Sequence, residues 1–376
     1  MTFGRTLTAL LLMPLFCVAQ AGPPALGLPP LPIPADNPQS AVKVKLGDKL
    51  FKDKRFSMTG EVSCATCHDP DKAFTDSPLK TSEGIHKLRG TRNAPTIINA
   101  AFFERMFWDG REPTLERQAT QPLINPIEMG LPENYAPLLA LVRSDPEYQA
   151  LFKDAFGVSG NAVGLLQISQ AMAAFERTII SGNSPFDHWY FAGEKTAISE
   201  SAQRGYKVYI GQGRCVSCHV ISQNDALFTD NRFHNINVGF QRIGDDARRF
   251  AVAFSSSKQR GVKVDEAVLA DAKSSELGRF AVNDAWTDLG AFKTPTLRNV
   301  ERTAPYMHDG SLAKLEDVVE FYNKGGKVKD EDPVNDYQSG GIRPLKLDDK
   351  QKADLVEFLK TLTSPEFAVQ QRADNQ

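Results

Sequence analysis

Two copies of the pattern Cys-x-x-Cys-His occur in this chain, at residues 64–68 and 215–219. At this spacing two thiols can form thioether bonds to the vinyl groups of one porphyrin, and the adjacent histidine can bind its iron. A redox-active dithiol or half of a zinc site is the alternative, but neither needs a histidine directly after the second cysteine. The motifs therefore predict two covalently bound haem c groups. The predicted attachment and iron-ligand residues are Cys64, Cys67 and His68 in the first copy and Cys215, Cys218 and His219 in the second.

The N-terminus has the features of a secretory signal peptide over residues 1–21. Arg5 is followed by a short apolar run and then by Ala19-Gln20-Ala21, which fits an Ala-x-Ala cleavage pattern. The apolar run is too short to span a membrane, and the residues before Cys17 are not the small ones expected at a lipidation site. We therefore expect cleavage after about Ala21, export to the periplasm and no membrane anchor.

Hydrophobic periodicity predicts a mostly α-helical fold, because apolar residues recur at steps of three and four and no stretch alternates as a strand does. Residues 22–38 are rich in proline and glycine and are expected to form an extended arm. Residues 69–97 and 223–290 are polar and are expected to be loop-rich. The formal net charge of −2 gives no basic field for nucleic acid. The predicted helices are 39–53, 133–144, 161–180, 199–212, 313–323 and 348–362.

An internal repeat indicates duplication. The pattern Pro-Thr-x-x-Asn at residues 95–99 recurs at 295–299, and Asp-Gly and Leu-Glu pairs recur at the same offset of 200 positions. The two haem motifs are only 151 positions apart, so the second module carries about 49 extra residues between its motif and the repeated block. We interpret the chain as two tandem cytochrome c-like domains, residues 39–185 and 186–376, with one haem each.

The same offset suggests how each iron is covered on its second side. Tyr322 stands at the position of Pro122, and proline has no atom that can bind iron. This pairing predicts an open first haem and a second haem with Tyr322 as ligand. Met307 is the rival ligand, and Tyr322 could instead be a core residue of the helix 313–323.

Several further motifs resemble those of the bacterial di-haem cytochrome c peroxidases and MauG. The resemblance covers nearly all of the chain after the signal peptide, in the same order. The motifs that carry it are Arg92-Asn93-Ala94-Pro95-Thr96, Phe107-Trp108-Asp109-Gly110-Arg111, Gln118-Ala119, Pro122, Asn125-Pro126-Ile127-Glu128-Met129, and residues 303–310 with the sequence TAPYMHDG.

This resemblance implies two haem domains, the first peroxidatic and the second for electron transfer. It also implies a tryptophan between the haems, matched by Trp108, and a calcium ion at the domain interface. The calcium residues are matched by Asn93, Thr303 and Pro305, whose oxygen atoms suit this hard cation.

The resemblance also assigns the chemistry of the open haem. Glu128 matches a general acid and base that moves a proton between the two oxygen atoms of hydrogen peroxide, and Gln118 can hold the peroxide by hydrogen bonds. Electrons then come from the second haem through Trp108. A loop histidine holds the first haem closed in ordinary di-haem peroxidases, and His86 lies in a similar loop. The other histidines outside the motifs, His188, His234 and His308, are expected to form structural hydrogen bonds.

Three functions are consistent with these residues. Phe-Tyr-Asn at 321–323 is similar to MauG, which favours an enzyme that stores oxidising equivalents on both haems and oxidises a protein substrate. A departure is Gly213, where MauG has an exposed tryptophan. The alternative is a cytochrome c peroxidase that draws electrons from a small cytochrome or copper protein. A non-enzymatic electron carrier is the third, but Pro122 and Glu128 argue against it because a carrier needs no open site.

Overall fold

The computed structural model describes residues 24–368, with the side chain of Asp245 excepted. The predicted signal peptide and Cys17 lie outside this range. No helix of the described residues is both long enough and apolar enough to cross a membrane. As predicted, the fold is mostly helical. The strands found in this range are the short antiparallel pair β1 (Phe233–His234) and β2 (Phe292–Lys293).

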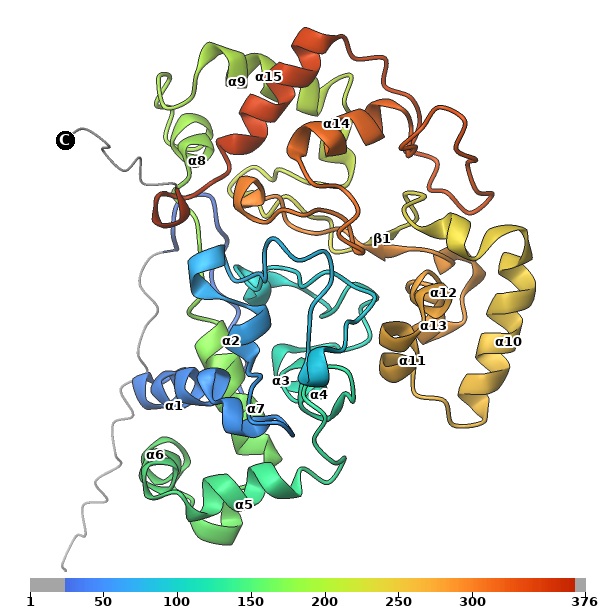
Figure 1. Ribbon diagram of the computed structural model, residues 1–376. Coiled ribbons are helices and arrows are strands. Elements are labelled where there is room, and N and C mark those ends of the chain that lie inside the picture. Colours follow the sequence, from blue (N-terminus) through green and yellow to red (C-terminus); the bar gives the residue numbers. More distant parts are fainter. Residues whose placement is uncertain (1–23, 369–376) are drawn as a thin grey trace, which may run out of the picture.

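Two packed helix pairs organise the two halves of the molecule (Figure 1). α1 (Ala41–Lys52) packs against α7 (Leu165–Glu176), and α9 (Glu200–Ile210) packs against α15 (Asp349–Lys360). The apolar faces of each pair contribute to a separate core. All four helices confirm predictions from hydrophobic periodicity, as do α5 (Ala136–Ser144) and α14 (Leu315–Asn323).

The remaining helices lie in the segments of the chain between these four. The α-helices are α2 (Cys64–Cys67), α3 (Leu115–Gln118), α4 (Gln121–Ile124), α6 (Pro146–Phe156) and α8 (Pro185–Tyr190), followed by the inserted helices described below. The 3-10 turns are Lys54–Phe56, Pro70–Lys72, Ile85–Lys87, Ala100–Phe102, Gly160–Ala162, Cys215–Ser217, Phe240–Arg242, Gly244–Asp246, Trp286–Asp288, Val300–Arg302 and Pro365–Phe367.

A glycine lets the two backbones meet in each pair. A Cβ atom on Gly47 would overlap the carbonyl oxygen of Ala171, and one on Gly205 would overlap that of Asp354. Glycine usually weakens a helix, but here it allows a closer approach than any other residue would. Gly47 and Gly205 therefore mark equivalent points in the two halves, and residues around them can be compared between the halves.

The offset of 200 positions found in the sequence is also a repeat of backbone structure. Met106 bridges Glu112, and Tyr306 bridges Leu312 in the same antiparallel way. The left-handed backbone conformation recurs as well, with φ of 61° at Asn99 and 58° at its counterpart 200 positions on. The repeated blocks in the two halves therefore have the same local fold.

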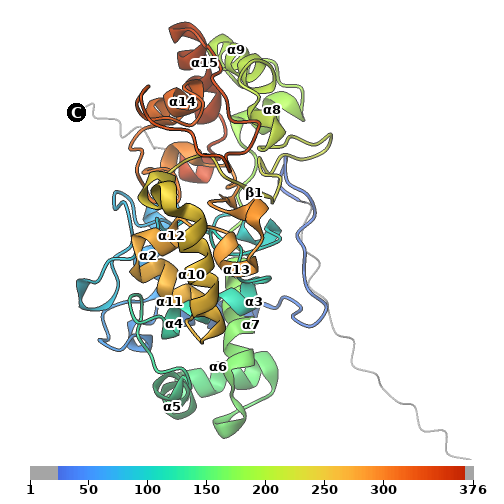
Figure 2. The ribbon, with the colours of Figure 1, turned by 90° about the vertical axis from the view of Figure 1, so that its right-hand side faces the viewer.

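The expectation of a loop-rich segment at 223–290 is wrong for its second part. Four helices lie there, and Figure 2 faces this group: α10 (Ala247–Gln259), α11 (Val264–Ala270), α12 (Ala272–Ser275) and α13 (Phe280–Asn283). They share a core of their own. The helical spacing of α10 is carried by Ala247, Ala251 and Phe254, and alanine gives only a weak hydrophobic signal. α6 and α8 were not predicted either.

Candidate functional site

A cavity of about 650 Å³ is lined by residues from both halves of the chain. It contains the histidine and at least one cysteine of each Cys-x-x-Cys-His motif. Of the predicted site residues, only Cys64 is not in its lining, and Cys64 packs against the core of the first half instead. The other predicted residues in the lining are Asn93, Trp108, Gln118, Pro122, Glu128, Thr303, Pro305 and Tyr322. The structure thus brings together residues that are up to 255 positions apart.

The two motif histidines have the same environment. The Nδ1 atom of His68 lies 3.2 Å from the carbonyl oxygen of Phe74, and that of His219 lies 2.9 Å from the carbonyl oxygen of Phe228. A carbonyl oxygen can only accept, so Nδ1 carries the proton and Nε2 is left with its lone pair. Burial lowers the pKa of both imidazoles, which keeps them neutral. This is the arrangement of a histidine that binds a metal through Nε2.

The four motif cysteines are not paired in disulfides. Burial raises the pKa of Cys67 and Cys215 to about 12, so these thiols do not ionise readily. Each motif also turns the same way, because the amide of His68 donates to the carbonyl of Cys64 at 2.9 Å and the amide of His219 donates to that of Cys215 at 2.9 Å. Free thiols beside a neutral imidazole fit the donor set of a haem c at each motif.

Pro122 interrupts a helix that is continuous in the second half. α14 runs unbroken from Leu315 to Asn323, whereas the corresponding segment is divided into α3 and α4. Proline has no N–H to donate to the carbonyl of Gln118, four residues before it. The break brings Gln118 and Pro122 into the lining of the cavity, where Tyr322 lies in the second half.

A tight turn positions Glu128. The side chain of Asn125 accepts a hydrogen bond from the amide of Ile127 at 2.9 Å, and its carbonyl accepts one from the amide of Glu128 at 3.2 Å. Burial raises the pKa of Glu128 to about 7, although the positive charge of Arg111 acts in the opposite direction. Such a carboxyl group can take up and release a proton near neutral pH.

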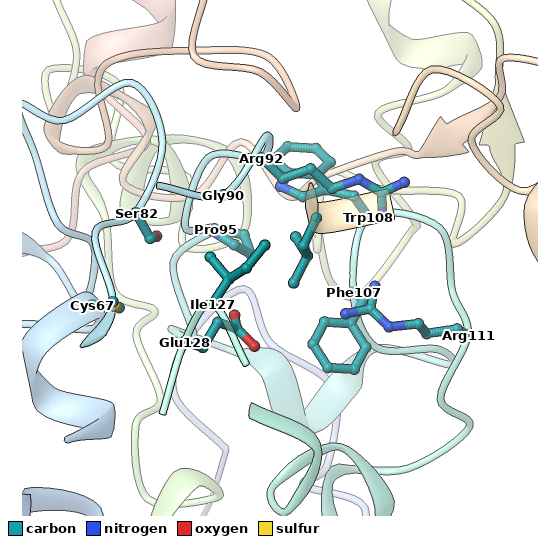
Figure 3. A pocket seen from close by; sticks show the side chains of 12 residues that line it. Cys67, Ser82, Gly90, Arg92, Pro95, Phe107, Trp108, Arg111, Ile127 and Glu128 are labelled. Atoms are coloured by element: carbon teal, nitrogen blue, oxygen red, sulfur yellow. The ribbon is translucent and has the colours of Figure 1, made fainter. Parts of the chain in front are cut away.

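Beside Glu128 lies a smaller cavity of about 60 Å³. Figure 3 shows Glu128 facing this space together with Phe107 and Arg111, whose guanidinium carbon is 3.5 Å from the centre of the Phe107 ring. The volume is sufficient for a molecule of the size of water or hydrogen peroxide. Leu269 of α11 lines the same space, so the inserted helices help to enclose it. Sequence reasoning missed this contribution because it predicted no helix there.

Trp108 is fixed by hydrogen bonds to both halves. Its indole Nε1 donates to the carbonyl of Asn93 at 2.9 Å, and its own carbonyl accepts from the amide of Lys293 at 2.8 Å. The corresponding residues of the repeat form the same hydrogen bond with the two halves exchanged: the amide of Asn93 donates to the carbonyl of His308 at 2.8 Å. Trp108 therefore lies at the junction of the two halves.

The residues matched to a calcium site come from both halves of the chain. Asn93, Thr303 and Pro305 all line the large cavity. The side-chain nitrogen of Asn93 donates to the carbonyl of Lys80 at 3.1 Å, and its side-chain oxygen accepts no hydrogen bond from any described residue. Carbonyl and amide oxygens of this kind fit the donor preference of calcium.

The two candidate ligands for the second iron both line the cavity. Tyr322 projects from α14, and burial raises its pKa. Met307 packs in the same hydrophobic cluster as Tyr322, from a turn in which its φ is 74°.

His86 does not face the cavity. It is exposed, and it is absent from the residues that line either cavity. Its neighbour Ile85 is buried, and the amide of Ile85 donates to the carbonyl of Glu128 at 3.0 Å, which anchors the turn with His86 on the outside.

The other histidines form structural hydrogen bonds, as predicted. Each pairs with a carboxylate among the described residues. The pairs are His188 with Glu194 at 2.9 Å, His234 with Asp230 at 2.8 Å, and His308 with Glu276 at 2.9 Å.

Two buried ionisable residues of the cavity were missed. Glu176 on α7 is 5% exposed, and burial raises its pKa to about 8. Lys293 on β2 is 8% exposed, burial lowers its pKa to about 7, and its Nζ lies 3.7 Å from the centre of the Phe103 ring. No ion pair joins either of them to another described residue. The sequence could have indicated that Glu176 is buried, because it lies at the end of an apolar helix. No pattern in the sequence around Lys293 indicates that this residue is buried.

Comparison with known proteins defines the class of this site. The family model described as di-haem cytochrome c peroxidase matches residues 41–196. A cytochrome-c peroxidase, IdrP1, from Denitromonas iodatirespirans is 36% identical over 92% of this chain and 87% of its own. The methylamine utilization protein MauG from Methylorubrum extorquens is 34% identical over 90% of this chain and 83% of its own.

The fold gives the same result. The crystal structure of a MauG-like protein associated with microbial copper homeostasis matches with a TM-score of 0.73, at 33% identity over 91% of this chain and 97% of that chain. The chain belongs to the di-haem cytochrome c peroxidase and MauG family. It is therefore an oxidoreductase, and family membership implies two haem c groups.

Proposed function

We propose that this protein is a periplasmic di-haem enzyme that reacts with hydrogen peroxide at an open haem and stores oxidising equivalents over two haems to oxidise a protein substrate. The observation that carries this proposal is the asymmetry between the two halves. Pro122, which cannot bind iron, lines the cavity in the first half, and the phenol of Tyr322 lines it in the second. An oxygen ligand favours higher oxidation states of iron than a thioether such as that of Met307 does.

In this proposal each half is a cytochrome c-like domain, residues 39–185 and 186–376. His68 and His219 would bind the irons of the haems through Nε2, and the cysteines of the two motifs would form the thioether bonds. Lys293 is a buried amine without a carboxylate partner among the described residues, and a propionate of a bound haem would supply a negative charge to pair with it. The haems supply the redox chemistry, which no side chain of the chain could perform alone.

The chain contributes positioning and proton transfer. Gln118 holds the peroxide by hydrogen bonds. Glu128 takes the proton from one oxygen atom of the peroxide and returns it to the other, which leaves as water. Its pKa of about 7 suits both steps near neutral pH. Trp108, held between the halves, carries electrons between the two sites. Asn93, Thr303 and Pro305 would hold a calcium ion, which would stabilise the contact between the halves.

A cytochrome c peroxidase that reduces hydrogen peroxide with electrons from a small cytochrome c or cupredoxin is the second candidate. It is favoured by Gly213, which stands where MauG has an exposed tryptophan. Gly213 is buried, and a Cβ atom there would lie 2.8 Å from the carbonyl oxygen of Val208, so a large side chain does not fit. A relative named cytochrome-c peroxidase and one named MauG are about equally similar to this chain in sequence, at 36% and 34% identity.

Stopped-flow absorbance of the as-isolated ferric holoenzyme tests the proposal. An immediate change of the haem spectrum on adding hydrogen peroxide, without prior reduction, is expected because Pro122 leaves the first iron open and His86 lies outside. If the ferric enzyme ignores peroxide and reacts only after one-electron reduction, the second candidate is correct. The same measurement on the fully reduced enzyme serves as the control for intact haems.

A further inference from the structure

A cluster of aromatic side chains connects the second haem motif with the molecular surface. It is built from α8, α9, α15 and the loop that accepts the hydrogen bond of His219. Neighbouring rings in it have centroids between 4.9 and 6.3 Å apart. Its members are Phe186, Trp189, Tyr190, Phe191, Tyr206, Tyr209, Phe228 and Phe358.

The inner end of the cluster touches the proposed iron ligand. Tyr209 is fully buried, and its hydroxyl donates to the backbone carbonyl of His219. Phe358 bridges to the next tyrosine, with its ring centroid 5.0 Å from that of Tyr209 and 5.7 Å from that of Tyr206. Tyr209 and Tyr206 are also one turn apart on the same helix, so they share a face.

The outer end reaches solvent. The ring of Tyr206 lies 5.0 Å from that of Trp189 and 5.8 Å from that of Tyr190. Tyr190 is 39% exposed, whereas Trp189 and Tyr206 are half-buried. The path from His219 to the surface therefore passes from a buried phenol to an exposed one.

The first half has the same buried contact without the oxidisable rings. Since Gly47 corresponds to Gly205, Phe51 takes the place of Tyr209 and Asp48 takes the place of Tyr206. The rings of Phe51 and Phe175 are 5.1 Å apart, as close as the equivalent pair in the second half. A phenylalanine at the position of Tyr209 would therefore be sufficient for the packing of the two helices. Phenols and indoles lose an electron far more readily than the ring of phenylalanine, so the difference between the halves is one of redox chemistry.

We propose that Tyr209, Tyr206 and Tyr190, with Trp189 beside them, form the route by which electrons from a partner protein reach the second haem. This inference rests on the proposed function and supplies the path that Gly213 cannot provide. In one cycle, Tyr190 gives one electron to the second haem through Tyr206 and Tyr209, and its phenolic proton passes to water. The resulting phenoxyl group then takes one electron from the partner protein and a proton from solvent.

The environments of the tyrosines also explain which of them retains the oxidation as a phenoxyl group. Tyr209 is enclosed, and its hydroxyl donates to a backbone carbonyl, which is a poor proton acceptor. Loss of its proton is therefore unfavourable, and Tyr209 passes electrons without retaining the oxidation. Of the three tyrosines, Tyr190 is the most exposed to solvent.

Peptide mass spectrometry after peroxide treatment tests this route. Holoenzyme without any electron donor is exposed to excess hydrogen peroxide, digested, and searched for oxidised or cross-linked side chains. We expect the modifications to gather at Trp189 and Tyr190. Tyr206→Phe should abolish those at Tyr190, and Tyr190→Phe should leave them on Trp189 alone. The matched control is Tyr337→Phe, a partly buried tyrosine of the second half that packs on Phe240 outside the cluster; it should match wild type.

The possible results separate the route from the proposed function. Haem absorbance is followed in the same samples. A normal absorbance change with modifications elsewhere, or modifications at Tyr190 that survive Tyr206→Phe, would overturn the route while the proposed function stands. If peroxide produces no absorbance change in wild type, both the proposed function and the route are wrong.

Discussion

Replacing Glu128 by glutamine keeps the shape of the side chain and removes its ability to exchange a proton. A positioned acid and base contributes about 10²–10⁴ to a rate, so Glu128→Gln should slow the reaction with hydrogen peroxide by that factor. The structure adds a second expectation. Since the pKa of Glu128 is about 7, the wild-type rate should rise with pH up to about that value and then level off, because the carboxylate form accepts the proton. The variant should lose this dependence.

The same shift in pKa predicts a change in stability. The ordinary pKa of a glutamate is 4.5 and that of Glu128 is about 7, so folding favours its protonated form. The stabilising contribution is complete below pH 4.5 and is lost as the pH rises through 7, a change of up to about 3 kcal/mol. Stability relative to Glu128→Gln should therefore fall across this range.

Stopped-flow absorbance from pH 5 to pH 9 measures the rate, and denaturant unfolding of the holoenzyme measures the stability. Glu104→Gln is the matched control, because Glu104 is exposed and forms no ion pair with another described residue. Glu104→Gln should match wild type in both assays. If Glu128→Gln reacts with peroxide at the wild-type rate and keeps the wild-type pH profile, Glu128 takes no part in proton transfer.

Three further predictions concern other parts of the molecule. Tyr322→Phe should change the ligand spectrum of the second haem while Met307→Leu leaves it unchanged; the opposite result assigns the iron to Met307. Lys293→Met should lower the midpoint potential of a haem in spectroelectrochemical titration, because a nearby positive charge favours the reduced state, and an unaltered potential would place the ammonium group away from both haems. Gly205→Ala should destabilise the protein by roughly 1–3 kcal/mol in denaturant unfolding, although alanine favours helices, because the new Cβ meets the carbonyl of Asp354. A gain in stability would show that the helices separate without cost.

The parts of the site that could be predicted from sequence are those fixed by local spacing. The haem motifs are complete within five residues, and the 200-position offset related Pro122 to Tyr322 without knowledge of the fold. The break between α3 and α4 also follows from a single proline. Four of the longer helices, α1, α7, α9 and α15, were predicted because their apolar residues repeat over several turns, whereas α6 and α10 were not.

The rest depends on contacts between distant segments. Lys293 becomes a buried cation only because β2 pairs with β1 beside Trp108, and nothing near it in the chain indicates that burial. Leu269 lines the small cavity from α11, a helix of only seven residues, and the longer α10 beside it is rich in alanine and serine. The aromatic route likewise joins residues of α8, α9 and α15, and no local pattern predicted that these rings meet.

The central claim is that the first haem is open and the second is capped in the resting enzyme. Low-temperature electron paramagnetic resonance of the as-isolated ferric holoenzyme tests it most directly, because a five-coordinate ferric haem is high-spin and a six-coordinate haem with two strong ligands is low-spin. We expect one high-spin signal from the haem at His68 and one low-spin signal from the haem at His219. Two low-spin signals, with the second lost in His86→Ala, would show that His86 closes the first haem and would contradict the account.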